Sequence, residues 1–337
     1  LAALVQLGVK HYRFGISWTR IFPDGRTLNE QGFAYYDKVV DLLIEHGITP
    51  WITLFHWDTP QALEDNGGWQ NRETAELLGK FAGVVAAHFR GRVGHYFTIN
   101  EPQCFIGLGY ETGWHAPGKK LTGEPLFRCW HNAMLAHGWM ASAVRAADPL
   151  AKVGAASCGL VCIPETDSTN DIEAAREAMF IFGIHPEIQL FSHNAFLDPV
   201  LLGKYPDHPF FQNALATAED FAIMRQPLDF IGLNFYNASM VRAGKAEPEY
   251  VPFPRGYPQT ALRWPITPAM MFYGTKFIFE RYQLPIYITE NGLSCNDKVF
   301  LDGKVHDPDR IDFLQRYLRE FKRAGESGVD IRGYFHW

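Results

Sequence analysis

The sequence of 337 residues has no stretch of about 18 consecutive apolar residues, so it predicts no membrane-spanning helix. It also lacks a run of Lys or Arg, and its net charge is −6. Nucleic acids and anionic membrane surfaces are therefore poor candidates as partners. No internal repeat, low-complexity segment or linker divides the chain. We expect a globular protein that binds neither a membrane nor nucleic acid.

Cysteine is scarce and scattered. The five cysteines form neither a CxxC pair nor a disulfide framework, so we expect a reducing compartment, the cytoplasm. The clustered ligands of a metal site are missing too. His131 and His137 are six positions apart, which does not place them on one helical face, so helix packing is the better interpretation. We expect no metal and no cofactor. The cysteines are Cys104, Cys129, Cys158, Cys162 and Cys295.

Strand-like and helix-like patterns alternate along the whole chain. The hydrophobic fraction of 47% is ample for a large core, and the length fits one barrel domain. Asp307-Pro308 offers a helix N-cap with proline at the first helical position. Amphipathic patterns predict helices over 1–8, 35–44, 74–90, 126–147, 268–282 and 307–325. β-Branched and aromatic runs predict strands over 10–18, 49–56, 94–100, 152–157, 229–236, 285–289 and 331–337.

Strands that alternate with helices predict parallel strands joined by right-handed crossovers. We therefore predict an α/β fold, a (β/α)8 TIM barrel, formed by residues 1–337 as a single domain. Its first strand would precede Leu1, and its final helix would follow Trp337. The alternative is an open doubly wound sheet, but no Gly-rich phosphate loop follows any strand. The glycines within 107–113 have the wrong spacing and no helix after them, so we predict a loop there.

Polar and aromatic side chains gather where the predicted strands end. Glu101 and Glu290 each follow an apolar strand and precede a strand-stopping Pro or Asn-Gly. The C-terminal ends of the strands are where α/β barrels place their chemistry. Most enzymes that cleave glycosidic bonds use a pair of carboxyl groups. The other such residues are Arg13, His56, Trp57, Asn100, Asn234, Tyr236 and Trp337.

Each of these residues also has a purely structural interpretation. A strand-end glutamate is often a capped surface residue, His56 could be a core histidine, and Arg13 could be an ion-pair partner. Asn234 could belong to an Asx turn, and the tryptophans to packing. Their recurrence at equivalent positions of different strands favours a site. We expect its pocket to be built by the long segments that follow strands, 59–72, 103–124 and 238–265.

The motifs around both glutamates resemble those of family one glycoside hydrolases, the β-glucosidase family. Thr-Ile-Asn-Glu-Pro at 98–102 is similar to the family's acid/base motif, and Ile-Thr-Glu-Asn-Gly at 288–292 to its nucleophile motif. The resemblance covers essentially the whole chain and implies a retaining β-glycosidase of carbohydrate metabolism and cellulose degradation. Its substrates would be β-glucosides, with β-galactosides and cello-oligosaccharides as further candidates. Other similar segments, in family order, are 12–21, 54–60, 231–236 and 333–337.

The resemblance also implies a role for each residue. Glu101 would be the general acid/base and Glu290 the nucleophile, with their carboxyl groups about 5–5.5 Å apart, as a retaining mechanism requires. Arg13 would support the nucleophile. The sugar would be bound by His56, Trp57, Asn100, Asn234, Tyr236 and Trp337.

The sequence departs from the family pattern in three places. A sugar-binding glutamine of the family's first strand would lie before Leu1. A sugar-binding Glu-Trp pair, and the residues that distinguish 6-phosphoglycosides, would lie after Trp337. Gln103 stands where the family often has an aromatic residue, which implies a weaker aglycone platform. Two alternatives to a β-glucosidase stay open: a 6-phospho-β-glycosidase, and a truncated, weakly active or inactive homologue that binds carbohydrate and is stabilised as a homo-oligomer.

Overall fold

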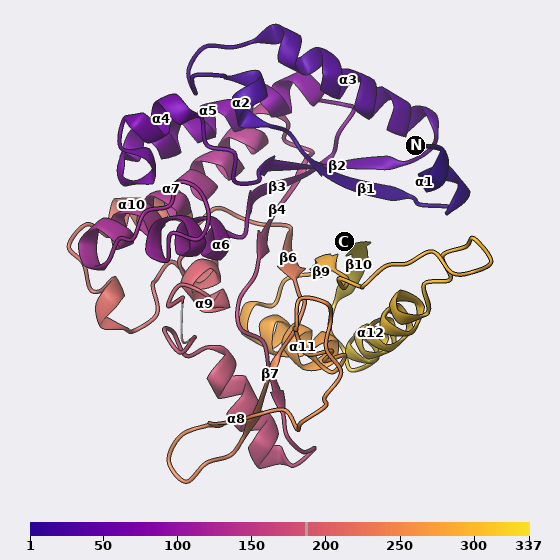
Figure 1. The fold of residues 1–337 in the computed structure, drawn as a ribbon. Helices are drawn as coiled ribbons and strands as arrows, with labels where there is room; N and C mark the ends of the chain where they lie inside the picture. The colour runs from indigo at the N-terminus through magenta and orange to yellow at the C-terminus, as the bar shows by residue number, and fades with distance from the viewer. Residues whose placement is uncertain (186–187) are drawn as a thin grey trace. The chain divides into compact units, whose positions relative to one another are not determined.

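The computed structural model describes residues 1–185 and 188–337, in which strands and helices alternate (Figure 1). The chain forms two compact units. The first unit comprises Leu1–Cys158 and Phe182–Gly232, and the second comprises Gly159–Ile181 and Leu233–Trp337. No helix within these described ranges is long and apolar enough to cross a membrane.

Parallel strands form the centre of the first unit. β1 pairs with β2, β2 with β3 and β3 with β4, and the first residues of β6 come next in the order. Strands β2, β3, β4 and β6 are almost wholly buried, as expected when both faces of a sheet are covered. The pairing of Asn100 with Ala156 aligns the C-terminal ends of β3 and β4. The strands are β1 (His11–Gly15), β2 (Thr49–Phe55), β3 (His95–Asn100), β4 (Lys152–Ser157) and β6 (Phe230–Asn234).

Helices of the first unit follow its strands, and α5 and α7 are the longest of them. Glycines allow α7 to approach its neighbours closely. A Cβ on Gly79 of α5 would lie 2.7 Å from the Trp139 Cβ, and one on Gly138 would lie 2.0 Å from the Ile223 carbonyl oxygen. The α-helices are α1 (Ala2–Gln6), α2 (Trp18–Ile21), α3 (Glu30–Glu45), α4 (Gln61–Asp65), α5 (Arg72–Phe89), α6 (Pro102–Ile106), α7 (Gly123–Ala147), α9 (His193–Leu197) and α10 (Ala218–Met224). Shorter 3₁₀ or π segments are η1 (Gly68–Gln70), η2 (Gly107–Glu111), η3 (Asp198–Leu202) and η4 (Pro209–Phe211).

The second unit contains the end of β6 and two further parallel strands. β6 lies beside β9, which pairs in parallel with β10. A separate three-stranded sheet has the order β5-β7-β8, with β7 and β8 antiparallel. The strands are β5 (Cys162–Pro164), β7 (Ser239–Arg242), β8 (Glu249–Val251), β9 (Ile286–Asn291) and β10 (Ile331–His336). The helices are α8 (Thr169–Met179), α11 (Met270–Tyr282) and α12 (Pro308–Glu326).

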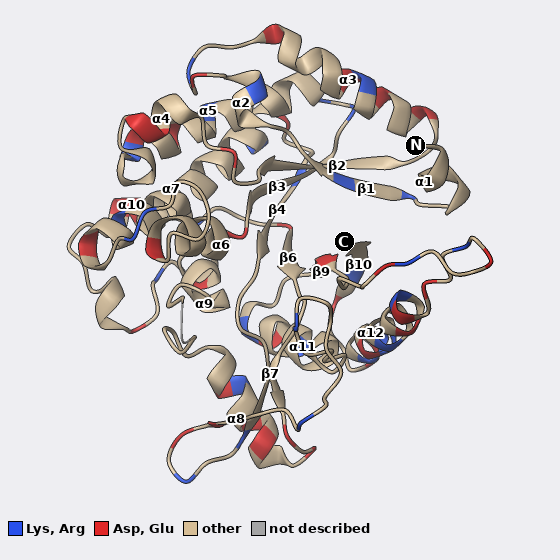
Figure 2. Cartoon of the chain, in the orientation of Figure 1, with Lys and Arg blue, Asp and Glu red and all other residues tan. Residues whose placement is uncertain are grey.

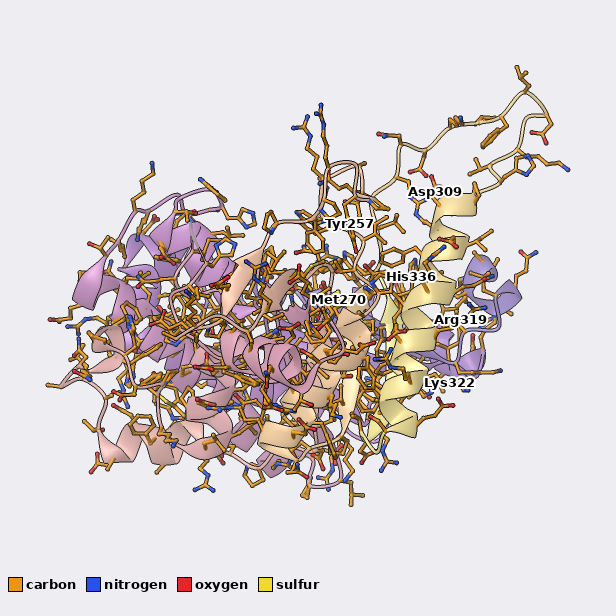
Figure 3. All side chains as sticks on the ribbon, turned by 90° about the horizontal axis from the view of Figure 1, so that it is seen from below. Tyr257, Met270, Asp309, Arg319, Lys322 and His336 are labelled. Atoms are coloured by element: carbon orange, nitrogen blue, oxygen red, sulfur yellow. The ribbon has the colours of Figure 1, made fainter. Side chains whose placement is uncertain are left out.

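Helix α12 shows how sequence pattern becomes packing in this unit. Phe313, Tyr317 and Phe321 recur at helical spacing and are buried. The Tyr317 hydroxyl accepts a hydrogen bond of 2.8 Å from the backbone N–H of Thr267. Acidic and basic residues alternate along the helix (Figure 2), and Arg319 and Lys322 are labelled on it in Figure 3. The helix therefore buries an aromatic stripe and presents charge elsewhere.

All seven predicted strands are present, with bounds that differ by a few residues. The predicted loop over 107–113 is wrong, because residues 107–111 form the π-helical segment η2 directly after α6. Pro308 begins α12 as predicted, but the Asp307 side chain does not cap the helix and instead contacts Arg310. The sequence did not predict the sheet β5-β7-β8, which lies partly in a segment expected to be a loop.

Candidate active site

Glu101 lies directly after β3 in a strained backbone conformation. Its φ of 47° is left-handed, which a residue with a side chain adopts at a cost of roughly 1–3 kcal/mol. The backbone N–H of Glu101 donates to the carbonyl of Ala156 at 2.9 Å, so pairing with β4 holds the residue in place. Pro102 then starts α6. Glu101 is only 6% exposed. Strain at a buried carboxylate is a recognised mark of a functional position.

Three predicted residues from consecutive strands meet beside Glu101. The Nε of Arg13 donates to Thr53 Oγ1 at 3.0 Å, and its guanidinium also donates to Asn100 Oδ1. Asn100 Nδ2 and His56 Nε2 are 3.2 Å apart. Thus Asn100 is held from both sides, by a cation and by an imidazole. The first unit thereby brings Arg13, His56 and Asn100 together.

Trp57 is the second strained residue of this region. Its φ is 78°, and its indole N–H donates to the carbonyl of Asn100 at 2.9 Å. The ring centroids of Trp57 and His115 are 5.6 Å apart. A tryptophan fixed at a strand end by backbone strain and by a hydrogen bond offers a rigid flat face to a ligand.

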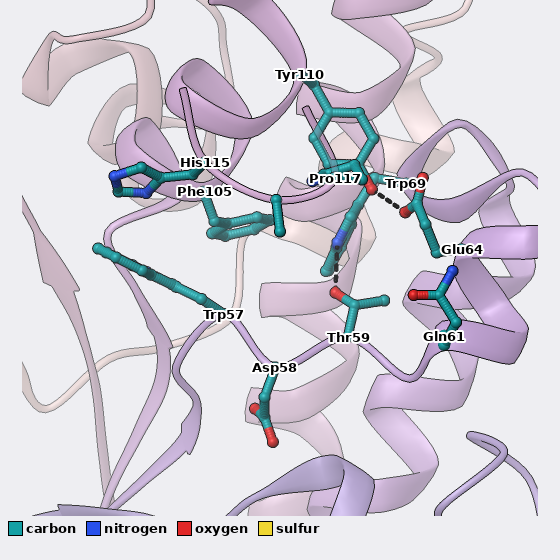
Figure 4. A pocket seen from close by; sticks show the side chains of 11 residues that line it. Trp57, Asp58, Thr59, Gln61, Glu64, Trp69, Phe105, Tyr110, His115 and Pro117 are labelled. Atoms are coloured by element: carbon teal, nitrogen blue, oxygen red, sulfur yellow. Dashed lines mark hydrogen bonds between the residues drawn. The ribbon is translucent and has the colours of Figure 1, made fainter. Parts of the chain in front are cut away.

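Trp57 lines a pocket of about 450 Å³ within the first unit. In Figure 4, Trp57 and His115 face each other, while Tyr110 and Glu64 are joined by a hydrogen bond. The Trp69 indole donates to Thr59 Oγ1 at 3.1 Å. The walls come from residues 57–69 and 105–117, which are two of the segments where we expected a pocket. The individual residues Glu64, Trp69, Tyr110 and His115 were not predicted, because they lie outside the strand ends and no short motif marks them in the sequence.

Asp58 is a titratable wall residue of this pocket. Burial raises the pKa of its carboxyl to about 6, although hydrogen bonds from Ser17 and from nearby backbone N–H groups act in the opposite direction. The carboxyl therefore changes charge in the mildly acidic range, well above the ordinary range of an aspartate.

The second unit contains the other predicted carboxylate, Glu290 on β9. It is 4% exposed, and its Oε2 accepts a hydrogen bond of 2.8 Å from the Tyr236 hydroxyl. Asn234 Oδ1 accepts from Thr289 Oγ1 at 2.5 Å, which ties the end of β6 to β9. Trp337 is 63% exposed, and its backbone N–H donates to the Asn291 carbonyl at 2.9 Å. This unit therefore places Asn234, Tyr236 and Trp337 around the end of β9.

The structure also locates His131, His137 and Gln103, which the sequence analysis discussed outside the predicted site. His131 and His137 pack in α7, as predicted: His131 contacts Asp220 at 3.1 Å, and His137 contacts Thr98 at 2.7 Å. Burial lowers the pKa of His137 to about 3, so its ring is neutral. Gln103 is fully buried and donates to Ser157 Oγ and the Ser192 carbonyl, both at 3.1 Å, so its side chain belongs to the core rather than to a platform.

One group of side chains among the described residues has the composition of a metal site. Glu101, Cys104 and Cys158 have potential ligand atoms within 4.8 Å of one another. Sequence reasoning missed it, although the ends of β3 and β4 are adjacent and both cysteines lie just after them. None of the five cysteines, all of which lie in the described residues, is in a disulfide.

Carboxylates and aromatic residues at the C-terminal ends of parallel strands are the mark of α/β-barrel enzymes. The profile described as glycosyl hydrolase family 1 matches residues 1–337. The chain is 36% identical over 339 residues to β-glucosidase A of Thermotoga maritima, covering 98% of this chain and 74% of that protein. It is 37% identical to a bifunctional β-D-glucosidase/β-D-fucosidase of Bifidobacterium breve, covering 100% and 76%.

Solved structures agree with the sequence comparison. The β-glucosidase of Thermotoga maritima in complex with deoxynojirimycin matches with a TM-score of 0.87 and 34% identity, covering 100% of this chain and 75% of that one. A structure of the Thermotoga maritima β-glucosidase with glucoimidazole matches equally well. The fold class is the (β/α)8 barrel. The chain belongs to glycosyl hydrolase family 1.

Proposed function

We propose that this family 1 enzyme is a retaining β-glycosidase that hydrolyses β-glucosides by double displacement. Glu290 is the nucleophile and Glu101 the general acid/base. The observation that carries the proposal is the placement of two buried glutamates, one directly after β3 and one in β9, each within a motif of the family. Relatives named β-glucosidase, and one named 1,4-β-D-glucan glucohydrolase at 37% identity, support glucosides as the substrate class.

The first chemical step forms a covalent glycosyl-enzyme. The Glu290 carboxylate attacks the anomeric carbon while the Glu101 carboxylic acid gives its proton to the departing glycosidic oxygen. The Tyr236 hydroxyl, 2.8 Å from Glu290 Oε2, orients the nucleophile. In the second step Glu101, now a carboxylate, takes a proton from water. The hydroxide so formed bonds to the anomeric carbon and frees Glu290, so the product keeps the β configuration.

The remaining predicted residues bind the sugar or hold the residues that do. Asn100 holds the 2-hydroxyl, and His56 and Trp57 bind the neighbouring hydroxyls. Arg13 fixes Asn100 in position through its guanidinium and supports the nucleophile. Asn234 and Tyr236 position Glu290, and the exposed ring of Trp337 stacks on the sugar. Flat apolar faces and rigid polar groups are the combination that carbohydrate sites require.

Two broader proposals accompany this function. Residues 1–337 act as one barrel domain, because strand β6 contributes residues to both compact units. The enzyme works in the cytoplasm, where reduced thiols are maintained; the five cysteines, which are thiols rather than disulfides, support this location.

The decisive experiment replaces the nucleophile and supplies an external one. Glu290→Ala should lower hydrolysis of nitrophenyl β-glucoside by at least about 10⁴-fold, the size of loss that follows removal of a nucleophile in other enzymes. Added azide should restore release of nitrophenol and give the α-glucosyl azide, because azide attacks the substrate directly. NMR spectroscopy identifies the anomer.

Glu101→Ala should respond differently. With a dinitrophenyl leaving group, which needs no proton, the first step should persist, and azide should give the β-glucosyl azide from the covalent intermediate. Glu326→Ala, at an exposed glutamate of α12, is the matched control and should retain full activity. A fully active Glu290→Ala enzyme would refute the assignment. Preferential turnover of nitrophenyl β-glucoside 6-phosphate would replace the substrate class while keeping the mechanism.

A further inference from the structure

Glu101, Cys104 and Cys158 form a compact group at the ends of two adjacent strands of the first unit. The backbone N–H of Glu101 donates to Ala156 of β4, and the N–H of Cys104 donates to the Glu101 carbonyl, both at 2.9 Å. Cys104 is thus one helical turn beyond Glu101, and Cys158 directly follows β4. The two Sγ atoms are 3.6 Å apart. Strand register and the first turn of α6 together fix the arrangement.

The neighbouring core restrains this group further. The Gln103 side-chain carbonyl accepts a weak hydrogen bond from the Cys158 thiol at 3.8 Å. The amide of Gln103 is held by Ser157 and Ser192. Cys158 is 4% exposed, whereas Cys104 is partly exposed. The group is therefore held in place on its inner side and reachable on its outer side, as a binding site requires.

These distances fit a tetrahedral zinc ion. With Zn–S bonds of about 2.3 Å, a tetrahedral angle puts two sulfur ligands about 3.8 Å apart. The Sγ–Sγ distance of 3.6 Å is close to that value. All three potential ligand atoms lie within 4.8 Å of one another, so small side-chain shifts bring them to one ion. Two thiolates favour zinc over Mg²⁺ or Ca²⁺, which prefer oxygen ligands.

We propose that Glu101, Cys104 and Cys158 form a zinc(II) site and that zinc bound there reversibly inhibits the enzyme. Binding releases one proton from each thiol and the proton of the Glu101 carboxylic acid, and it involves no electron transfer. A water molecule completes the tetrahedron, as in other sites with three protein ligands. A Glu101 carboxylate bound to zinc cannot carry the proton that the departing glycosidic oxygen needs. The inhibition rests on the proposed function of Glu101, whereas the binding of zinc does not.

Binding is tested first, without reference to activity. Zinc chloride is titrated into the reduced protein in competition with a chromophoric zinc indicator. We expect one zinc ion per chain and an affinity that rises with pH, because the thiols must lose their protons. Cys104→Ser should weaken binding by more than the roughly 100-fold that follows loss of an outer-sphere partner. Cys295→Ser, the control at a cysteine of the second unit, should bind zinc as the wild type does.

Two further measurements use the wild-type protein alone, so they do not depend on whether a variant folds. Cadmium chloride added to the wild type should produce the ultraviolet charge-transfer absorption of cadmium–thiolate bonds, which requires no substitution. Magnesium chloride should produce neither this absorption nor displacement of zinc. Absence of the cadmium signal, or equal zinc affinity of the wild type and Cys104→Ser, overturns the proposal and leaves the proposed glycosidase function unaffected.

Activity is tested second, with nitrophenyl β-glucoside. The wild-type rate should fall in proportion to zinc occupancy and return when EDTA is added. At zinc concentrations that inhibit the wild type, Cys104→Ser should hydrolyse the substrate at the same rate as it does without zinc. Zinc binding with an unchanged rate would overturn the inhibition and contradict the role of Glu101. A loss reversed by dithiothreitol but not by EDTA would indicate a Cys104–Cys158 disulfide and would also overturn the proposal.

Discussion

The hydrogen bond from the Tyr236 hydroxyl to Glu290 allows a sharp test of the proposed nucleophile. The bond is 2.8 Å long and is made to a buried carboxylate. Hydrogen bonds to charged groups contribute about 1.5–3 kcal/mol. Since each 1.36 kcal/mol is a factor of ten in rate, Tyr236→Phe can slow a step that depends on this bond by roughly 10- to 150-fold. The size of the effect differs between the two chemical steps.

In the proposed mechanism, Glu290 loses its negative charge when it attacks the sugar and regains it when the glycosyl-enzyme is hydrolysed. The phenol bond is therefore strongest at the end of the second step, where Glu290 departs as a carboxylate. Tyr236→Phe should slow hydrolysis of the intermediate by the full 10- to 150-fold estimated above, and should slow its formation much less. The intermediate should accumulate.

Stopped-flow measurement with dinitrophenyl β-glucoside checks this expectation. We expect a burst of about one dinitrophenolate per enzyme molecule followed by a slow steady state, with kcat and KM lowered together. Tyr257→Phe is the matched control, because it removes a tyrosine hydroxyl of the same unit that donates its hydrogen bond to the Ile266 carbonyl. An unchanged kcat without a burst, or a kcat/KM that falls as much as kcat, would refute the reasoning.

Further predictions concern stability. Gly138→Ala should lower the free energy of unfolding by about 1–3 kcal/mol, because the new Cβ meets the Ile223 carbonyl at 2.0 Å; Gly83→Ala in α5, where the nearest atom is 3.4 Å away, should be neutral or stabilising in the same urea titration. The pKa of Asp58 is raised to about 6, so protonation favours the folded state, and this contribution is lost as pH rises from about 4 through 6. Relative to Asp58→Asn, the wild type should therefore lose at most about 3 kcal/mol of its free energy of unfolding over that range. If the unfolding free energies of the two proteins change with pH in parallel, Asp58 contributes nothing.

The strands and the ends of the strands were predictable because they depend on local sequence. The apolar run before Asn100-Glu101 and the proline after it define both the length of β3 and its end. The same reasoning placed Glu290 at β9. Glycosidase activity could also be predicted from the sequence, because the two carboxylates that it needs lie within short, contiguous motifs.

Features that depend on distant contacts were not predictable. The burial of Gln103 follows from hydrogen bonds to Ser157 and Ser192, which lie 54 and 89 positions away. The π-helical turn after α6 contains Gly109, where a Cβ would lie 2.6 Å from the carbonyl oxygen of Ala116, a contact that the local pattern does not show. The proximity of Cys104 and Cys158 requires the register of β3 and β4. None of these has a signature within a window of ten or fifteen residues.

The left-handed backbone of Glu101 has a consequence for protein engineering. A glutamate pays for this conformation in stability, whereas glycine or asparagine tolerates it. Replacing Glu101, the proposed acid/base, with either residue relaxes the main chain and also removes the carboxyl group. Inactive variants of this kind should therefore be more stable than the wild type, so their unfolding free energies are poor references for it. A selection for thermal stability alone would favour inactive variants at this position. If Glu101 has the proposed role, a strained glutamate is the cost of placing an acid/base at this position.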